Sequence, residues 1–232
     1  MFNFFGIQLQ IELISMLIVL SVIFTFLYFI NKEIKKADPL AKPTPFLTVG
    51  MVYYKLFKGL VRDNMGKKAN KNYEPYIAAL AMYLFISNIL GLFALPSPTA
   101  NYSVTLTLAL ITFVLIQYTK IKTNSFKGYL LGFFQPFPPF VIMNVFGLIA
   151  PLISMSLRLF GNITSGSVLM LLFYTFTQWV SKLILPFVDF NFIGIATAPF
   201  LHLYFDLFAG FIQTYIFISL TTIFIGIELP QE

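Results

Sequence analysis

Cysteine is absent from this 232-residue sequence, and histidine occurs only once. The chain therefore cannot form a disulfide, offers no thiolate nucleophile and cannot hold a metal in a histidine-rich cluster. Charged residues are also scarce, at 10% of the chain against about 25% in ordinary soluble domains. Hydrophobic residues make up 58%, which is more apolar surface than a core of this size could bury. A soluble globule is excluded, and much of the chain must face lipid.

Catalytic signatures are missing as well. The sequence contains no internal repeat, no glycine-rich phosphate loop and no GxSxG or HExxH motif. We therefore expect no catalytic centre, no cofactor and no metal site. In a membrane protein the net charge of +6 sets the topology of the chain, so we expect no nucleic-acid partner.

The apolar residues gather in runs long enough to cross a membrane, which takes about 20 helical residues. The first run, 11–30, predicts a spanning helix. A cleaved signal peptide is the alternative, but the positive charges follow this run and no small-residue cleavage site comes after it. Residues 75–118 hold two more runs, joined by an uncharged segment with two prolines, and predict a helical hairpin with its turn on the outer side.

Segment 31–74 differs in composition, since it holds ten of the fifteen Lys and Arg residues. The positive-inside rule places such a loop on the inner side, which predicts an outer N-terminus and an inner C-terminus. Within the loop, 46–65 carries apolar residues at helical spacing and predicts an amphipathic helix on the inner surface; a solvated basic linker is the alternative. The apolar residues of this pattern are Leu47, Met51, Tyr54, Phe57 and Val61.

Two overlong apolar runs follow, at 137–176 and 190–228. A single helix of the first extent would be roughly 60 Å long, twice the hydrocarbon thickness, so it must break or lie at a steep tilt. The fold class that follows is an all-α integral membrane protein, a single membrane domain over 1–232 with about five membrane helices and one surface helix. The residues available for kinks are Pro138, Pro139, Pro151 and Gly161 in the first run and Pro199 in the second.

One charge stands inside the first long run. Arg158 has no carboxylate near it in the sequence, since none occurs between Glu74 and Asp189. An arginine at membrane depth costs about 2.5–3.5 kcal/mol on insertion scales, so it needs a partner carboxylate on another helix or another chain. Snorkelling to the headgroups is the alternative. Helical spacing places four polar residues on one face of this helix: Ser154, Arg158, Asn162 and Ser165. Ser167 lies on the opposite face.

A second polar stripe lies in the last run. His202, Asp206 and Gln213 follow one another at steps of four and seven, and Asp206 is the only carboxylate between residues 190 and 227. An imidazole titrates near neutral pH, so His202 beside a carboxylate has the parts of a proton relay. The alternatives are a histidine bonded at the outer interface and an aspartate that serves only as a structural partner of Arg158 or His202.

These residues carry a resemblance to a known family. The segments Ser156–Gly166 (SLRLFGNITSG) and Ile212–Phe217 (IQTYIF) resemble the signature pair of subunit a of F-type ATP synthases. The segment 98–109 (PTANYSVTLTLA) is similar to the start of a spanning helix in bacterial members, which favours a bacterial plasma membrane over a mitochondrial one.

The resemblance implies a proton-translocating stator, whose two long helices face a ring of c subunits. It implies two aqueous half-channels, with Arg158 facing the ring carboxylate and preventing a leak between them, and Asn162 and Gln213 near this arginine. The implied partners are the c-ring, the peripheral-stalk b subunits, the remaining synthase subunits and the bilayer. The sequence departs from the family at Ser167, Asp206, Asn144 and Asn101, which are expected on the proton path.

Two other functions explain parts of the sequence. A secondary transporter or channel would use Arg158 to bind an anionic substrate, but such carriers usually show paired repeats, and none is found. An assembly subunit of a respiratory complex would explain the hydrophobicity and leave Arg158 and Asp206 without a purpose.

Overall fold

Most of the chain is helical. The computed structural model describes residues 2–4, 7–9, 11–38, 42–66, 70–93, 95–187 and 190–229, and so leaves Asp189 outside the description. Five stretches of the described residues are long and apolar enough to cross a membrane. These stretches are 11–36, 73–93, 102–132, 138–184 and 192–227. The prediction of an all-α, multi-pass membrane protein is confirmed.

The N-terminal part contains two short strands that the sequence did not predict. Strands β1 (Phe2–Phe4) and β2 (Ile7–Leu9) pair antiparallel and precede helix α1 (Ile11–Lys36). Helix α2 (Pro45–Met65) covers the amphipathic pattern. Its start is set locally, because the Thr44 hydroxyl accepts a hydrogen bond from the Leu47 amide at 3.3 Å and a proline occupies the first helical position.

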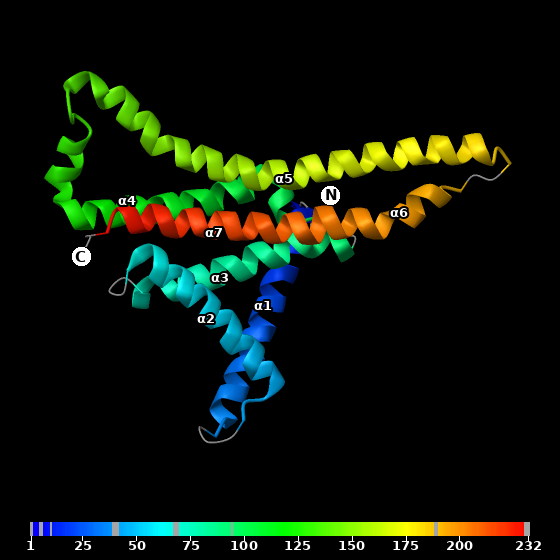
Figure 1. The fold of residues 1–232 in the computed structure, drawn as a ribbon, viewed down its shortest axis with the longest axis horizontal. Helices are drawn as coiled ribbons and strands as arrows, with labels where there is room; N and C mark the ends of the chain where they lie inside the picture. The colour runs from blue at the N-terminus through cyan, green and yellow to red at the C-terminus, as the bar shows by residue number, and fades with distance from the viewer. Residues whose placement is uncertain are drawn as a thin grey trace.

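Helices α3 and α4 form the next pair. Helix α3 (Asn70–Ile89) continues through the 3₁₀ turns η1 (Leu90–Phe93) and η2 (Pro98–Ala100) into α4 (Tyr102–Gly132). Helix α4 is broken at Ser125, whose φ of 61° lies in the left-handed region that interrupts a right-handed helix. The part after Ser125 therefore turns away from the rest of α4 and leads into the following loop (Figure 1).

Helix α5 (Val141–Ile184) is the longest element, with 44 residues. It is unbroken through Pro151, and Pro138 and Pro139 lie in a separate 3₁₀ turn, η3 (Pro138–Phe140). At 1.5 Å per residue α5 is roughly 66 Å long, so it can stay within a bilayer only at a steep tilt. The structure shows α5 as one continuous helix that bends gently along its length (Figure 1), which leaves a steep tilt as the alternative that fits a bilayer.

The last long stretch is divided by an irregular segment. Helix α6 (Phe192–His202) is followed by the π-helical segment η4 (Leu203–Phe208) and by α7 (Ala209–Ile227). The interruption expected at Pro199 is displaced, because α6 passes through this proline and the irregularity begins at Leu203. One proline removes one backbone donor, which a membrane helix tolerates. A π-helical turn is rare and often accompanies a functional site.

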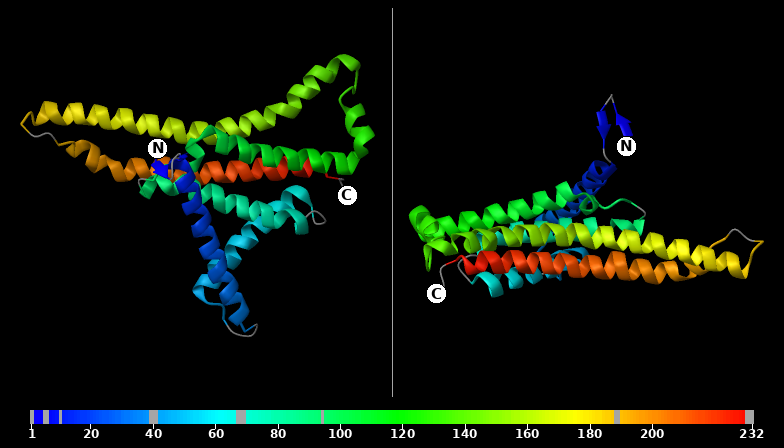
Figure 2. Two further views of the ribbon diagram at one scale, coloured as in Figure 1. Left: turned by 180° about the vertical axis from the view of Figure 1, so that it is seen from behind. Right: turned by 90° about the horizontal axis from the view of Figure 1, so that it is seen from above.

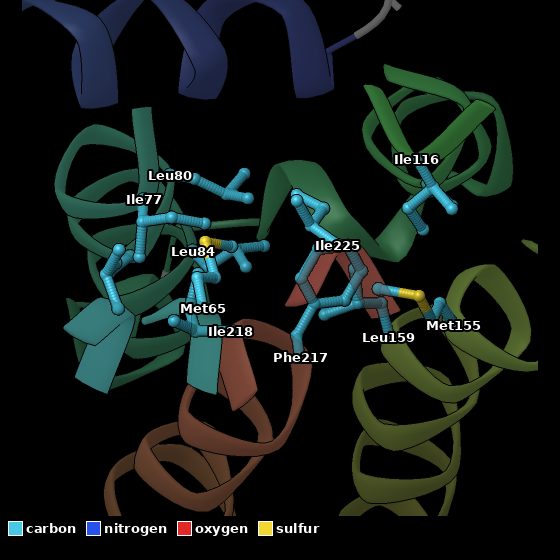
Figure 3. Close-up of a cluster of buried hydrophobic side chains, with 13 residues drawn as sticks. Met65, Ile77, Leu80, Leu84, Ile116, Met155, Leu159, Phe217, Ile218 and Ile225 are labelled. Carbon is cyan, nitrogen blue, oxygen red and sulfur yellow. The ribbon is translucent and has the colours of Figure 1, made fainter. Parts of the chain in front are cut away.

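The long helices lie side by side. Helix α5 runs antiparallel along α6 and α7, with α3 and α4 beside α7, while α1 and α2 diverge from this layer (Figures 1 and 2). Figure 3 shows the apolar core, where Met155 and Leu159 of α5 point toward Phe217 of α7. The core leaves the opposite side of α5 uncovered, and large apolar side chains such as Leu157 and Val168 are exposed there.

Two tyrosines connect α2 to α3. The Tyr53 hydroxyl donates to the Ala78 carbonyl and the Tyr54 hydroxyl donates to the Glu74 carboxylate, both at 2.5 Å. Burial raises the pKa of Tyr53, and the bond to Glu74 raises the pKa of Tyr54 because it favours the protonated phenol. Both groups therefore remain hydrogen-bond donors at neutral pH.

Helix α2 crosses the end of α7 at a glycine. A Cβ atom at Gly226 would overlap the Asn64 carbonyl oxygen, and the Asn64 amide donates to Thr222 at 2.8 Å beside this contact. We expect Gly226→Ala to separate α2 from α7 and to lower the amount of subunit in the membrane, since overpacking typically costs about 1–3 kcal/mol. Immunoblotting of isolated membranes measures the amount of subunit. Gly59→Ala, where a Cβ meets no atom within 4 Å, is the control, and equal levels of the two variants would refute the contact.

Candidate functional site

Arg158 lies on the open face of α5. Its side chain is exposed, and its Nη2 donates to the Ser154 hydroxyl at 3.2 Å, one turn earlier. No carboxylate pairs with it in the described part of the chain. The neighbouring residues Met155 and Leu159 are buried in the core, so the arginine points away from it. A cation thus stands on a helix long and apolar enough to cross a membrane, with no carboxylate partner among the described residues.

The polar stripe around Arg158 is present on the helix. Ser165 is exposed and donates to the Asn162 carbonyl at 3.3 Å, while the buried Nδ2 of Asn162 has no partner among the described residues. Ser167 is exposed too, and its hydroxyl donates to the Thr164 carbonyl of its own helix at 2.9 Å. Ser167 is therefore not bonded to Asp206.

Asp206 and His202 form a close pair one turn apart. The Asp206 carboxylate lies 2.6 Å from His202 Nδ1, and the Tyr174 hydroxyl of α5 lies 3.3 Å from His202 Nε2. The side chains of His202 and Asp206 are 40% and 22% exposed, so the pair is accessible from outside the helix bundle. With Nδ1 protonated, His202 donates to Asp206 and Tyr174 donates to Nε2. The three groups form a continuous chain of exchangeable protons.

Small residues make room for Asp206. A Cβ atom at Gly91 would lie 3.0 Å from the Asp206 carboxylate, so the turn after α3 can touch this group only because it has no side chain there. On the other side, Gly166 of α5 packs against Phe205, whose ring lies 3.7 Å from the position of a Cβ. The π-helical segment is thus held between the end of α3 and the middle of α5.

A buried polar network fixes α7 just beyond this segment. Asn88, 2% exposed, donates to the Gly210 carbonyl and to the Thr214 hydroxyl, each at 3.3 Å. Its side-chain oxygen accepts from Thr99 at 3.1 Å, and Thr99 lies 2.7 Å from the Ser97 hydroxyl. The network ties the loop after α3 to the first turn of α7, and so anchors the end of η4.

Asn191 ties the start of α6 to the end of α5. Its amide donates to the Tyr174 carbonyl and the Thr177 hydroxyl, each at 3.1 Å, and its oxygen accepts from the Gly194 amide at 2.8 Å. A Cβ at Gly194 would collide with this side chain. Because Tyr174 is held by the same residue that caps α6, its ring is placed near His202, which lies about three turns further along α6.

Gln213 and Asn101 have other surroundings. Gln213 is 6% exposed, and its Nε2 has no partner among the described residues. Asn101 caps α4, where its side chain accepts from the Ser103 amide at 2.9 Å. The hydrogen bonds of the described residues do not link Gln213 to the His202 and Asp206 pair.

A second polar region lies at the far end of α7. A cavity of about 340 Å³ lies between α4, the start of α5 and the end of α7. Asn144 lines it and donates to the carbonyls of Phe133 and Gln135 at 2.8 and 3.0 Å, which holds the loop before α5. The polar residues that share this lining are Gln117, Lys120, Tyr129, Asn144 and Glu228.

Sequence reasoning did not find several of these groups. Tyr174 lies 28 residues from His202, and Lys120 lies 108 residues from the Glu228 carboxylate to which it is bonded at 3.0 Å. No helical spacing relates such residues, so only an alignment of relatives or the fold itself could pair them. Among the described residues, no group of three or more His, Asp or Glu side chains could hold a metal ion.

The fold and these side chains define a class: a multi-pass helical membrane protein with ionisable groups at membrane depth on two long, adjacent helices. A family model described as ATP synthase A chain matches residues 13–226. The chain is 33% identical to ATP synthase subunit a of Sulfurihydrogenibium sp. (strain YO3AOP1), over 94% of this chain and 95% of that protein.

Two further relatives have the same name. They are ATP synthase subunit a of Mycoplasma genitalium, 33% identical over 90% of this chain and 76% of that protein, and of Staphylococcus aureus (strain JH9), 30% identical over 99% and 96%. The chain belongs to the ATP synthase subunit a family. Members of this family are non-catalytic membrane subunits of the complex.

Proposed function

We propose that this chain is the proton-translocating stator subunit of a rotary F-type ATP synthase, and that Arg158 couples proton flow to rotation of a c-ring. The observation that carries the proposal is the exposed, unpaired Arg158 on the open face of α5. A fixed cation in a low-dielectric setting attracts a carboxylate and repels a proton. A ring carboxylate that passes Arg158 therefore loses its proton on one side and regains one on the other.

The outer half-channel in this proposal ends at the Tyr174, His202 and Asp206 chain. Its hydrogen-bonded geometry and partial exposure support proton exchange with water and with a ring carboxylate. Gln213 and Asn162 carry buried amide groups without partners in the described chain, which supports a place beside the ion path, where water or the ring would complete their hydrogen bonds. Ser167 and Asn101 are also assigned to the path; the Ser167 hydroxyl donates to the Thr164 carbonyl, and the Asn101 side-chain oxygen accepts from the Ser103 amide.

The inner half-channel is assigned to the cavity that Asn144 lines. Five polar side chains line the cavity, which is large enough for several water molecules. The basic segment 31–74 supports an inner position for α2, and hence an outer N-terminus and an inner C-terminus.

The other subunits of the synthase are the partners that membership of this family implies. We assign the c-ring to the open face of α5 and expect peripheral-stalk b subunits elsewhere on the single membrane domain, 1–232. The named relatives are bacterial, which supports a bacterial plasma membrane as the location.

Crosslinking in native membranes tests the proposal, because the chain has no cysteine of its own. We expect Asn162→Cys and Ile163→Cys to give a product with a c subunit that carries one cysteine next to its carboxylate. Ser156→Cys is the matched control, since Ser156 is fully buried on the same helix. No product from any exposed position of α5 would reject the ring interface. Transport by the chain reconstituted alone would instead favour a carrier.

A further inference from the structure

The cavity between α4, α5 and α7 contains a pair of opposite charges. Lys120 Nζ of α4 lies 3.0 Å from Glu228 Oε1, directly after α7. The Glu228 side chain is 19% exposed and that of Lys120 is 34% exposed. Among the described residues that line the cavity, the titratable groups are Lys120, Tyr129 and Glu228. Glu228 is thus the only carboxylate in this lining.

The hydrogen bonds around the pair leave the carboxylate open to the cavity. The Tyr129 hydroxyl donates to the Gln117 side-chain oxygen at 3.1 Å, so these two residues satisfy each other. The side-chain amide of Asn144 donates both of its hydrogen bonds to backbone carbonyls. Lys120 is therefore the side chain that binds Glu228, through Oε1 alone, and the second oxygen of Glu228 remains available to water.

The cavity leads toward Arg158. Its lining reaches Pro151 of α5, seven residues before Arg158, which is roughly 10 Å along the helix axis. Water that fills this cavity would therefore reach from Glu228 to within about two helical turns of the arginine. No titratable residue of α5 lies in this lining within the described part of the chain.

We propose that Glu228 is the proton-exchanging group at the mouth of this cavity and that Lys120 positions it. This inference rests on the proposed function and adds to it a residue pair in the inner half-channel. The exchange is balanced: the Glu228 carboxylate accepts a proton from hydronium and leaves water, and in the opposite direction the carboxyl returns the proton to water. A carboxylate in the wall of a water-filled cavity raises the local concentration of protons when bulk protons are scarce.

Proton pumping by the complete synthase in inverted membrane vesicles tests the pair, because the inner side then faces the medium. We expect Glu228→Gln to lower ATP-driven pumping by about tenfold at alkaline pH and less at acidic pH, where hydronium supplies the channel directly. Glu228→Asp should retain much of the flux, and Lys120→Gln should lie between wild type and Glu228→Gln. A structural role alone would lower pumping equally at all pH values.

Two control variants remove the same charges at other positions of the chain. Lys122→Gln removes an exposed lysine two residues from Lys120, and Glu33→Gln removes a half-buried carboxylate of α1 that accepts a bond from Thr44. Both should pump as wild type does. A wild-type pH profile in Glu228→Gln, with pumping lost in Arg158→Ala, would reject this inference alone. Normal pumping in Arg158→Ala would reject the proposed function.

A second experiment tests whether water enters the cavity, and it does not depend on whether the Glu228 variants fold. Gly147 lines the cavity, and a Cβ there meets no atom within 4 Å, so Gly147→Cys should fold normally. We expect a membrane-impermeant thiol reagent to label it from the inner side, while the buried Ser156→Cys stays unlabelled. Failure to label Gly147→Cys from that side would overturn the proposal, since Glu228 would then have no aqueous route inward.

Discussion

Replacement of Arg158 by alanine should abolish ATP-driven proton pumping by the assembled synthase, while ATP hydrolysis by its soluble part continues. The expected loss is at least about 100-fold, the scale on which removal of a preorganised charge affects a reacting centre. The reason is electrostatic, because no other cation of the described chain stands on this face of α5 at membrane depth. Without it, a deprotonated ring carboxylate has nothing to stabilise it in lipid.

The variant should also leak. In our proposal Arg158 separates the two half-channels, so its removal should raise passive proton permeability once the soluble part is stripped from the membrane. Arg158→Lys keeps the charge but loses the planar fork that now donates to Ser154, and a buried lysine gives up its proton more readily. We therefore expect strongly impaired pumping there too.

Fluorescence quenching in inverted vesicles measures both effects, with ATP hydrolysis recorded in parallel. Lys122→Gln, on an exposed position of α4, provides the control for loss of a positive charge. Coupled pumping at the normal rate in Arg158→Ala would exclude the stator mechanism.

Replacement of Asp206 by asparagine should reduce proton flux by about tenfold or more in either direction. The change preserves the shape of the side chain and leaves His202 in place, but it removes the group that exchanges a proton 2.6 Å from the imidazole. Asparagine can accept from His202 but cannot carry a proton onward. An unchanged flux would make Asp206 a structural partner of His202 and nothing more.

Gly91→Ala tests whether the position of the carboxylate matters. The added methyl group would lie 3.0 Å from Asp206, so the carboxylate must shift while its chemistry stays intact. We expect a smaller fall in flux than for Asp206→Asn, and Gly59→Ala serves as the control because it adds a methyl group in open space. Equal flux in the two glycine variants would mean that the contact at Gly91 has no part in proton transfer.

The membrane helices were predictable because hydropathy is a local property. The ends of the helices were less predictable. Helix α1 continues six residues past the apolar run, to Lys36, since basic side chains with long apolar stems can extend a helix to the membrane surface. Helix α4 continues past 118 to Gly132, with a break at Ser125 that no sequence rule required. The strands β1 and β2 were missed although each alternates apolar and polar residues, because a run of three residues is too short to indicate a strand.

The candidate site was predictable only where its residues share one helix. The spacing of four between His202 and Asp206 predicted their contact, and the same spacing predicted that Ser154 would lie beside Arg158. The π-helical segment was not predicted, since its sequence is as apolar as the α-helical turns around it. The segment lies against Gly91 and Gly166, which belong to other elements of the fold.

The sequence by itself determined the class of this protein and the approximate positions of its helices, and it singled out Arg158 as a charge inside an apolar run, because hydropathy is read directly from the chain. Tertiary structure decided which face of α5 stays open, which tyrosine reaches His202 and which lysine binds Glu228. The physical reason is that these outcomes depend on how helices distant in the chain pack against one another. Buried glycines and asparagines set that packing at close range, and their effect has no local signature.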